Sequence, residues 1–236
     1  MVFGNDDFNG PLDGKIHSST TDGIKAGLDL VKKWMDHPAM NKRLVILNGG
    51  EKGTPGRHDF MGDGHNVTIL GCTLWSKHRG DQVPNEIEKL DIELMGNSSK
   101  KNNARHEKDL NWLRHAIAEI RIREADPDRV IIVMTHHAPC ITRTVSPDLN
   151  EFFGLFWSDF QVDILGGEGM RGLGKGDVWV FGHTHWSADF QQDDVRIFAN
   201  QRGREGEKSR EEFDGKRVLE VECGVPKEWR NWSVPY

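Results

Sequence analysis

Two apolar segments of this sequence run directly into histidines, and this arrangement constrains the fold more than any other feature. The two strand-like runs are residues 131–134 and 178–181. The first leads into His136 and His137, and the second leads into His183 and His185. In an open α/β sheet, binding and catalytic groups gather outside the carboxyl ends of the strands. We therefore expect a layered α/β domain in which these four imidazoles meet at one edge of the sheet.

The spacing of the second pair predicts that both rings face one crevice. Residues i and i+2 of an extended segment point to the same side, so His183 and His185 are expected to project together. Gly182 precedes them and lets backbone or ligand approach without a Cβ in the way. Several neutral imidazoles suit Zn, Mn or Fe better than Ca or Mg. The alternative for each histidine is a hydrogen-bonded core residue. His137 is equally compatible with a place behind the ligands, against a substrate or in packing.

The rest of the chain alternates helix and strand patterns, which again indicates a layered α/β fold. Helices are expected at residues 21–37 and 104–125, where apolar side chains recur every three or four positions. Short apolar runs predict strands at residues 1–5, 44–47, 67–74, 195–198 and 218–221, and polar runs predict loops at residues 49–65, 80–103 and 202–216. The aromatic group at residues 152–157 is expected either to pack into the core or to line a substrate wall.

Length and composition exclude several classes of protein. A chain of 236 residues can bury a core as one domain or at most two small ones. No window approaches the roughly 18 uninterrupted apolar residues of a membrane span. The net charge of −6 argues against a protein that coats nucleic acid. Three scattered cysteines form neither a disulfide framework nor a zinc-binding C-x-x-C pair. This cysteine usage fits a reducing, intracellular setting, so we expect a cytoplasmic protein. Residues 1–20 also lack the basic and apolar regions of a signal peptide.

The two histidine motifs, with residues 67–75 and 199–203, resemble the calcineurin-like metallophosphoesterase superfamily. Within it, the chain is most similar to the fungal and bacterial Ser/Thr-phosphatase-like phosphoesterases. The resemblance implies a layered αββα sandwich that is incomplete at the N-terminus. It also implies that residues 1–236 form a single domain, equivalent to about the C-terminal two-thirds of the family domain.

The resemblance implies a function and a set of site residues. In the family, two divalent ions, here Mn, Zn or Fe, activate water for attack on the phosphorus of a phosphate ester. The substrate is then a small-molecule or macromolecular phosphomonoester or phosphodiester. By position, Asn5, His136 and His183 ligate one ion, and His185 ligates the other. His137 and Asp6 fall at catalytic positions. Three cations are further expected phosphate contacts or simply solvated charges: Arg143, Lys175 and Arg202.

The sequence departs from the family pattern at its N-terminal motifs. Asp6 stands where the family has histidine, and no residues match the D-x-H and G-D-x-x-D motifs that come earlier. An ionised Asp6 would repel phosphate, although it could ligate a metal instead. The alternative is therefore a non-catalytic pseudo-phosphoesterase or a truncated gene product that keeps the fold and at most one metal. A metal-free interaction module with core histidines is a third hypothesis.

Overall fold

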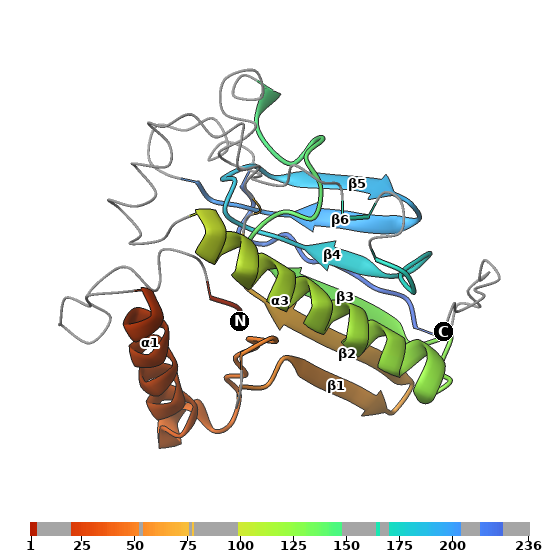
Figure 1. The fold of residues 1–236 in the computed structure, drawn as a ribbon. Coiled ribbons are helices and arrows are strands. Elements are labelled where there is room, and N and C mark those ends of the chain that lie inside the picture. The colour runs from red at the N-terminus through yellow and green to blue at the C-terminus, as the bar shows by residue number, and fades with distance from the viewer. Residues whose placement is uncertain are drawn as a thin grey trace.

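A computed structural model shows a mixed α/β fold, which confirms the fold class expected from the sequence. It describes residues 1–3, 20–51, 54–75, 77, 99–147, 164–165, 170–203 and 213–223. Within these residues, six strands form one sheet in the order β1-β2-β3-β4-β6-β5 (Figure 1). The strands are β1 (Arg57–Gly62), β2 (His65–Cys72), β3 (Val130–Thr135), β4 (Val178–Val180), β5 (Ala188–Gln192) and β6 (Val195–Ala199).

The centre of the sheet is parallel, and this direction positions the site. Strands β2, β3, β4 and β6 pair in parallel, while β1 and β5 are antiparallel to their neighbours. Cys72 at the end of β2 lies opposite Thr135 at the end of β3. Met134 lies opposite Val180, the last residue of β4. The loops after these strands, and the histidines they carry, therefore begin at the same edge of the sheet.

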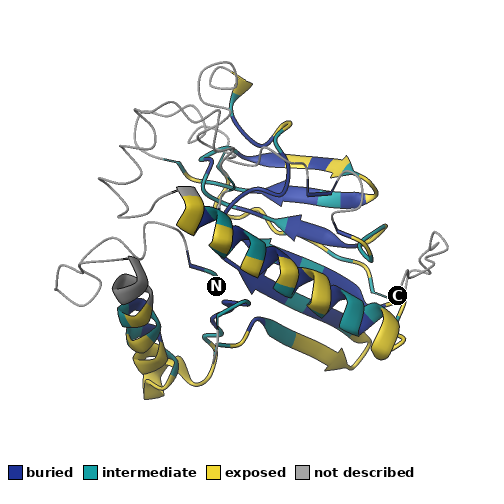
Figure 2. Cartoon of the chain, in the orientation of Figure 1, coloured by how far each residue is buried: buried dark blue, intermediate teal, exposed yellow. Residues whose placement is uncertain are grey.

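Helix α3 (Ser99–Ala118) covers one face of the sheet and continues as a π-helical stretch, η3 (Glu119–Arg123) (Figure 1). Its apolar residues Leu110, Leu113 and Ile117 recur at helical spacing and are buried against the strands. Figure 2 shows the same division along the helix, with exposed residues on the side away from the sheet. Each buried aliphatic side chain contributes about 1.5–3 kcal/mol relative to an exposed one.

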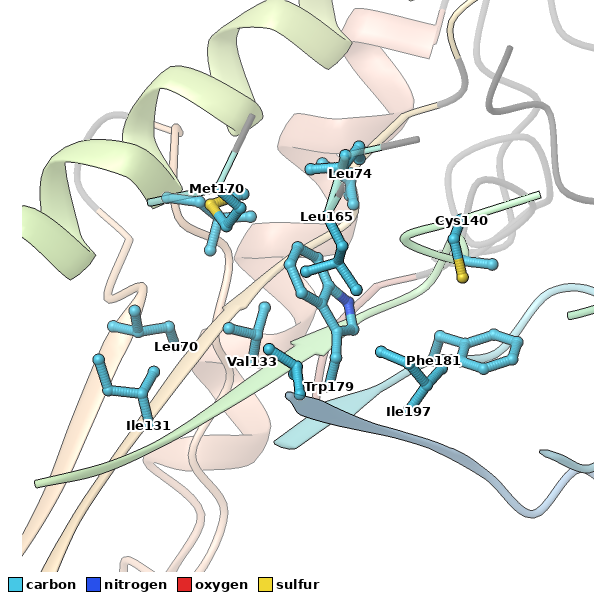
Figure 3. Packing of buried hydrophobic residues seen from close by; sticks show 14 of the residues in the cluster. Leu70, Leu74, Ile131, Val133, Cys140, Leu165, Met170, Trp179, Phe181 and Ile197 are labelled. Carbon is cyan, nitrogen blue, oxygen red and sulfur yellow. The ribbon is translucent and has the colours of Figure 1, made fainter. Parts of the chain in front are cut away.

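Trp179 of β4 lies in the middle of this main core, and its indole ring is fully buried. Figure 3 shows it among Val133, Leu165 and Ile197, which come from three other parts of the chain. The indole nitrogen does not remain unpaired, because Nε1 donates to the hydroxyl of Thr135 at 2.8 Å. A buried tryptophan usually finds such a partner. This contact ties the packed core to the residue just before His136.

A second, smaller core lies beside helix α1 (Thr20–Met35), which a short 3₁₀ helix, η2 (Pro38–Met40), follows. In it, α1 packs against the segment at residues 44–47 and against Phe3. Met1 N donates to Val45 O at 3.0 Å and Leu47 N donates to Met1 O at 2.8 Å, which is the pattern of a parallel pair. A Cβ on Gly71 would lie 2.6 Å from Leu47 Cβ, so this pair packs directly on β2. Because Leu70 and Cys72 face α3, this contact is on the opposite face.

Several predicted elements differ from the observed ones. Residues 44–47 and 1–3 pair with each other but are not strands of the sheet. The predicted loop at 49–65 contains β1, whose outer residues are polar or exposed because it is an edge strand. Strand β5 was not expected. The predicted strand at 218–221 is wrong, because Val218 is exposed and the segment pairs with none of the described strands. Helix α3 begins at Ser99, inside the predicted loop.

Other predictions concern residues outside those that the structure describes. The aromatic group at residues 152–157 lies outside the described residues, as do Asn5 and Asp6. Within the described residues one sheet is present, so the second sheet of an αββα sandwich stays a prediction. Among the described helices, none is long and apolar enough to cross a bilayer.

Candidate metal centre

The first two histidines are fixed at the end of β3 by contacts with both neighbouring strands. Thr135 Oγ1 donates to His137 O at 2.6 Å and accepts from Trp179 Nε1 of β4. His137 N donates to Thr73 O, just past β2, at 3.2 Å. The backbone that carries His136 and His137 is therefore held from both sides, and Ala138 and Pro139 after it are buried. Such support fixes the backbone from which both rings project.

The second motif reaches the site by a turn rather than by an extended strand. Strand β4 ends at Val180, and Gly182 N donates to His136 O at 2.9 Å. His183 has φ of 69° and His185 has φ of 52°, so both occupy the left-handed region. The prediction that they share one side of an extended segment is therefore wrong in its geometry. A non-glycine residue in that region costs about 1–3 kcal/mol and persists only where its surroundings hold it.

Three of the four histidines come together. His183 Nδ1 lies 3.1 Å from His136 Nε2. The ring centroids of His137 and His183 are 4.2 Å apart, and those of His136 and His137 are 5.1 Å apart. Ligand nitrogens of all three residues lie within 4.8 Å of one another. We call His136, His137 and His183 the histidine cluster.

The environment of the cluster keeps His136 in the form that binds metals. Burial is the main cause that lowers the pKa of His136 from 6.5 to about 4, and the nearby charge of His185 is the second cause. Desolvation disfavours the imidazolium ion. His136 is therefore neutral at pH 7 and has a nitrogen lone pair to donate.

The donor set fits a divalent ion of the zinc type. Zinc binds imidazole nitrogen at about 2.0–2.1 Å, so two nitrogens on one tetrahedral ion are separated by about 3.3 Å. The 3.1 Å between His183 Nδ1 and His136 Nε2 is close to that separation. Burial also limits competing water at His137, which is 2% exposed, while His136 and His183 are half-buried. The cluster offers only nitrogen, which suits Zn, Mn or Fe better than Ca or Mg.

The fourth histidine does not belong to the cluster, although it lies near enough to influence the pKa of His136. His185 N donates to the side chain of Gln201 at 2.7 Å. Sequence reasoning missed Gln201 as a site residue. The available signal was its place just after β6, which pairs in parallel with the strand that precedes the histidine turn. Of the three expected phosphate contacts, Arg143 instead stacks on Phe190, with its Cζ 4.3 Å from the ring centroid.

Helix α3 contributes two buried polar residues to the same edge, and these were also missed. Asp109 Oδ2 accepts from Leu74 N at 2.8 Å, and His106 Nδ1 lies 2.6 Å from Trp75 O. They stand three positions apart on one face of the helix. Leu74 has φ of 54°, so this pair holds the strained turn that follows β2. Both residues lie within the predicted helix at residues 104–125, but their bonds to the turn after β2 were not foreseen.

Asp109 makes stability depend on pH. Burial raises the pKa of Asp109 from 3.8 to about 7, with Glu51 also raising it, while the Leu74 amide, Lys108 and Arg105 lower it. The folded protein then binds more protons than the unfolded chain between about pH 4 and pH 7, so stability falls as pH rises through that window. Asp109→Asn keeps an acceptor for Leu74 and does not ionise. We expect it to raise the free energy of unfolding at pH 8 by about 2 kcal/mol, roughly half of what three pKa units represent.

Urea unfolding of wild type and Asp109→Asn at pH 5 and pH 8 checks this prediction. Asp29→Asn is the matched control, because Asp29 is an exposed aspartate on α1. The control should change the free energy of unfolding by less than about 0.5 kcal/mol at either pH. An Asp109→Asn protein that is less stable than wild type at pH 8 would show that the ionised carboxylate is stabilising.

Comparisons with known proteins leave the family open. No protein-family profile matches the sequence, and no curated protein matches it. A structural match was found to a solved structure, a candidate 5'-nucleotidase from Staphylococcus aureus in complex with alpha-ketoglutarate. The sequences are 14% identical, the match covers 86% of this chain and 32% of that chain, and the TM-score is 0.38. A similarity at this TM-score carries no conclusion for this chain.

Proposed function

We propose that this chain is a metal-dependent hydrolase of phosphate esters whose divalent ion is held by the histidine cluster. The observation that carries the proposal is the convergence of three imidazoles from the ends of two parallel strands, with ligand atoms within 4.8 Å of one another. Phosphate as the substrate group rests on the resemblance of the two histidine motifs to calcineurin-like metallophosphoesterases. With that resemblance we also propose that residues 1–236 form one domain.

The residues divide into roles within this proposal. His136 and His183 are the proposed metal ligands. His137 has a catalytic position by resemblance, and its place beside His183 supports a role as a third nitrogen donor. His185 stays a proposed ligand of a second ion. When bound, a divalent ion neutralises charge on a phosphoryl group and lowers the pKa of a water. Burial lowers the pKa of His136 and so favours its neutral form, and the buried ring of His137 limits the access of bulk water on its side of the cluster.

Asn5 and Asp6 keep the roles that the resemblance implies, as a metal ligand and a catalytic residue, but only as proposals. An amide oxygen from Asn5 would add a neutral donor to the three nitrogens. Replacing Asp6 by histidine, the residue of the family pattern, would remove a carboxylate that repels phosphate.

A second candidate function is favoured by the make-up of the cluster. Among the described residues the group contains three imidazoles and no carboxylate. Two-metal phosphoesterase chemistry uses two ions about 3.5–4 Å apart, and a set of three neutral donors is better suited to one ion. A non-catalytic domain that binds a single metal ion would fit this composition.

Hydrolysis assays separate the two functions. Purified protein is incubated with aryl phosphate monoesters and diesters, with added Mn²⁺, Zn²⁺ or Fe²⁺ and with chelator. The hydrolase proposal expects turnover that requires metal and that His183→Ala abolishes. Stoichiometric metal binding without turnover of either ester class would favour the single-ion binding domain. Turnover that persists in chelator would contradict both.

A further inference from the structure

The turn that carries His183 and His185 has no regular secondary structure, so its backbone groups need partners from elsewhere. Residues 181–187 lie between β4 and β5 and join neither strand. The neighbouring loop follows β6, which pairs in parallel with β4 through Val180 and Phe198. Both loops therefore leave the same edge of the sheet, and Gln201 is the second residue after β6.

A single glutamine side chain bonds to three consecutive residues of this turn. Gln201 Oε1 accepts from His185 N at 2.7 Å. Its Nε2 donates to Thr184 Oγ1 at 3.0 Å and to Trp186 O at 2.9 Å. The backbone of Gln201 adds a fourth bond, since its N donates to Ser187 Oγ at 3.1 Å. Thr184 and Ser187 are both buried, and the four bonds themselves are partly buried.

The bonds of Gln201 reach a segment whose backbone is strained. The two histidines with positive φ, His183 and His185, lie on either side of Thr184. A strained backbone persists when surrounding contacts determine it, and strain of this kind concentrates at functional sites. Gln201 provides those contacts from the next strand. The same turn carries the ring of His183, whose Nδ1 is 3.1 Å from His136 Nε2.

We infer that Gln201 is the positioning residue of the metal centre. It acts through the backbone of residues 184–186 to hold the His183 ring against His136, without being a ligand itself. The inference rests on the proposed metal-binding function and deepens it. Residues that orient metal ligands typically contribute 10–100-fold to metal affinity, although they do not touch the ion.

Asn200 provides a matched control for this inference. It is the adjacent residue, it is half-buried like Gln201, and it too uses its amide to hold a neighbouring segment. Asn200 Nδ2 donates to Asp214 O at 2.8 Å, and Asp214 N donates to Asn200 Oδ1 at 3.3 Å. Asn200→Ala therefore removes a pair of side-chain bonds to Asp214 and leaves the bonds of Gln201 to the histidine turn in place.

The test compares Gln201→Ala, Gln201→Glu and Asn200→Ala by two measurements. The first is Zn²⁺ affinity in competition with a chromophoric chelator, together with the visible spectrum of the Co²⁺-loaded protein. We expect Gln201→Ala to weaken Zn²⁺ binding about 10–100-fold and to alter the Co²⁺ spectrum. Gln201→Glu keeps the shape and the acceptor for His185 but loses the donor to Trp186, so it should be weakened as well. Asn200→Ala should stay within about threefold of wild type.

The second measurement needs no metal. NMR spectra of protein with ¹⁵N-labelled histidine rings report the His183 and His136 imidazoles directly. Both Gln201 variants should shift these ring signals, and Asn200→Ala should not. Equal effects of Gln201→Ala and Asn200→Ala, or unchanged rings in both Gln201 variants, would overturn the inference. If wild type binds no metal, the proposed function fails, while the ring spectra still decide whether Gln201 positions His183.

Discussion

Asp177→Ala should lower the free energy of unfolding by about 3–5 kcal/mol, because it leaves a buried guanidinium without its counter-charge. The Asp177 carboxylate is fully buried and pairs with Arg121, whose side chain is 7% exposed. Two bonds of 3.0 and 2.9 Å join Arg121 Nη2 to the two carboxylate oxygens. Ile131 N and Gly174 N donate to the same carboxylate at 2.8 and 2.9 Å. Removing it therefore orphans three donors at once.

Asp189→Ala is the matched control for this prediction. Asp189 also receives a two-pronged contact from an arginine, with Arg196 Nε and Nη2 both at 2.9 Å. Its side chain is 31% exposed, however, and that of Arg196 is 36% exposed. Pairs in contact with water contribute about 0–1 kcal/mol. Urea denaturation at pH 7 measures both variants. If Asp177→Ala and Asp189→Ala lowered the free energy of unfolding equally, burial would not explain the importance of the Asp177 pair.

His183→Ala should weaken binding of Zn²⁺ or Mn²⁺ by more than about 100-fold, because loss of a ligand exceeds the 10–100-fold loss caused by residues around ligands. His136→Ala should behave in the same way, since its Nε2 and His183 Nδ1 are the closest pair in the cluster. Equilibrium dialysis against buffered metal measures both affinities. His65→Ala is the control, because His65 is exposed at the start of β2.

His185→Ala then distinguishes one ion from two. His185 lies outside the histidine cluster, so a single-ion site should keep its affinity within a few-fold of wild type in this variant. If His185 ligates a second ion, the number of bound ions should fall instead. If His183→Ala bound metal with wild-type affinity while His185→Ala bound none, the metal site would lie outside the histidine cluster.

The sequence was most informative where one physical cause decides the structure. The apolar run Val130–Thr135 is a central strand because it packs on both faces, and its four-residue hydrophobic core was recognisable without a structure. The stripe of residues 24–35 likewise located α1 to within two residues. Both histidine motifs were expected at one edge of the sheet, and the parallel pairing of β3 with β4 places them at the same edge.

Edge strands escaped prediction because their sequence carries little apolar signal. Strand β1 contains His58, Asp59 and a terminal glycine, and its outer side remains exposed. It exists because β2 offers it a full antiparallel register from Arg57 to Gly62. Strand β5 depends on β6 in the same way. Such pairing is set by tertiary context rather than by the local pattern.

The sequence identified residues of the site but not the backbone geometry that positions them. His136 and His183 were expected together and lie together. The periodicity of an extended segment could not reveal the left-handed turn at His183 and His185, because the turn bonds to Gln201, which lies 16 positions beyond His185. Buried polar partners such as Asp109 were also invisible, since their pairing joins residues 35 positions apart. Long-range hydrogen bonds of this kind leave no local signature in a sequence.

X-ray absorption spectroscopy of the Zn²⁺-loaded protein is the most direct measurement of whether the histidine cluster binds a metal ion. Wild type should show at least two imidazole groups around each zinc, with nitrogen at about 2.0–2.1 Å. The double variant His136→Ala, His183→Ala should retain no stoichiometric zinc. Zinc bound in wild type without imidazole neighbours, or bound equally well by the double variant, would contradict a metal centre at these histidines.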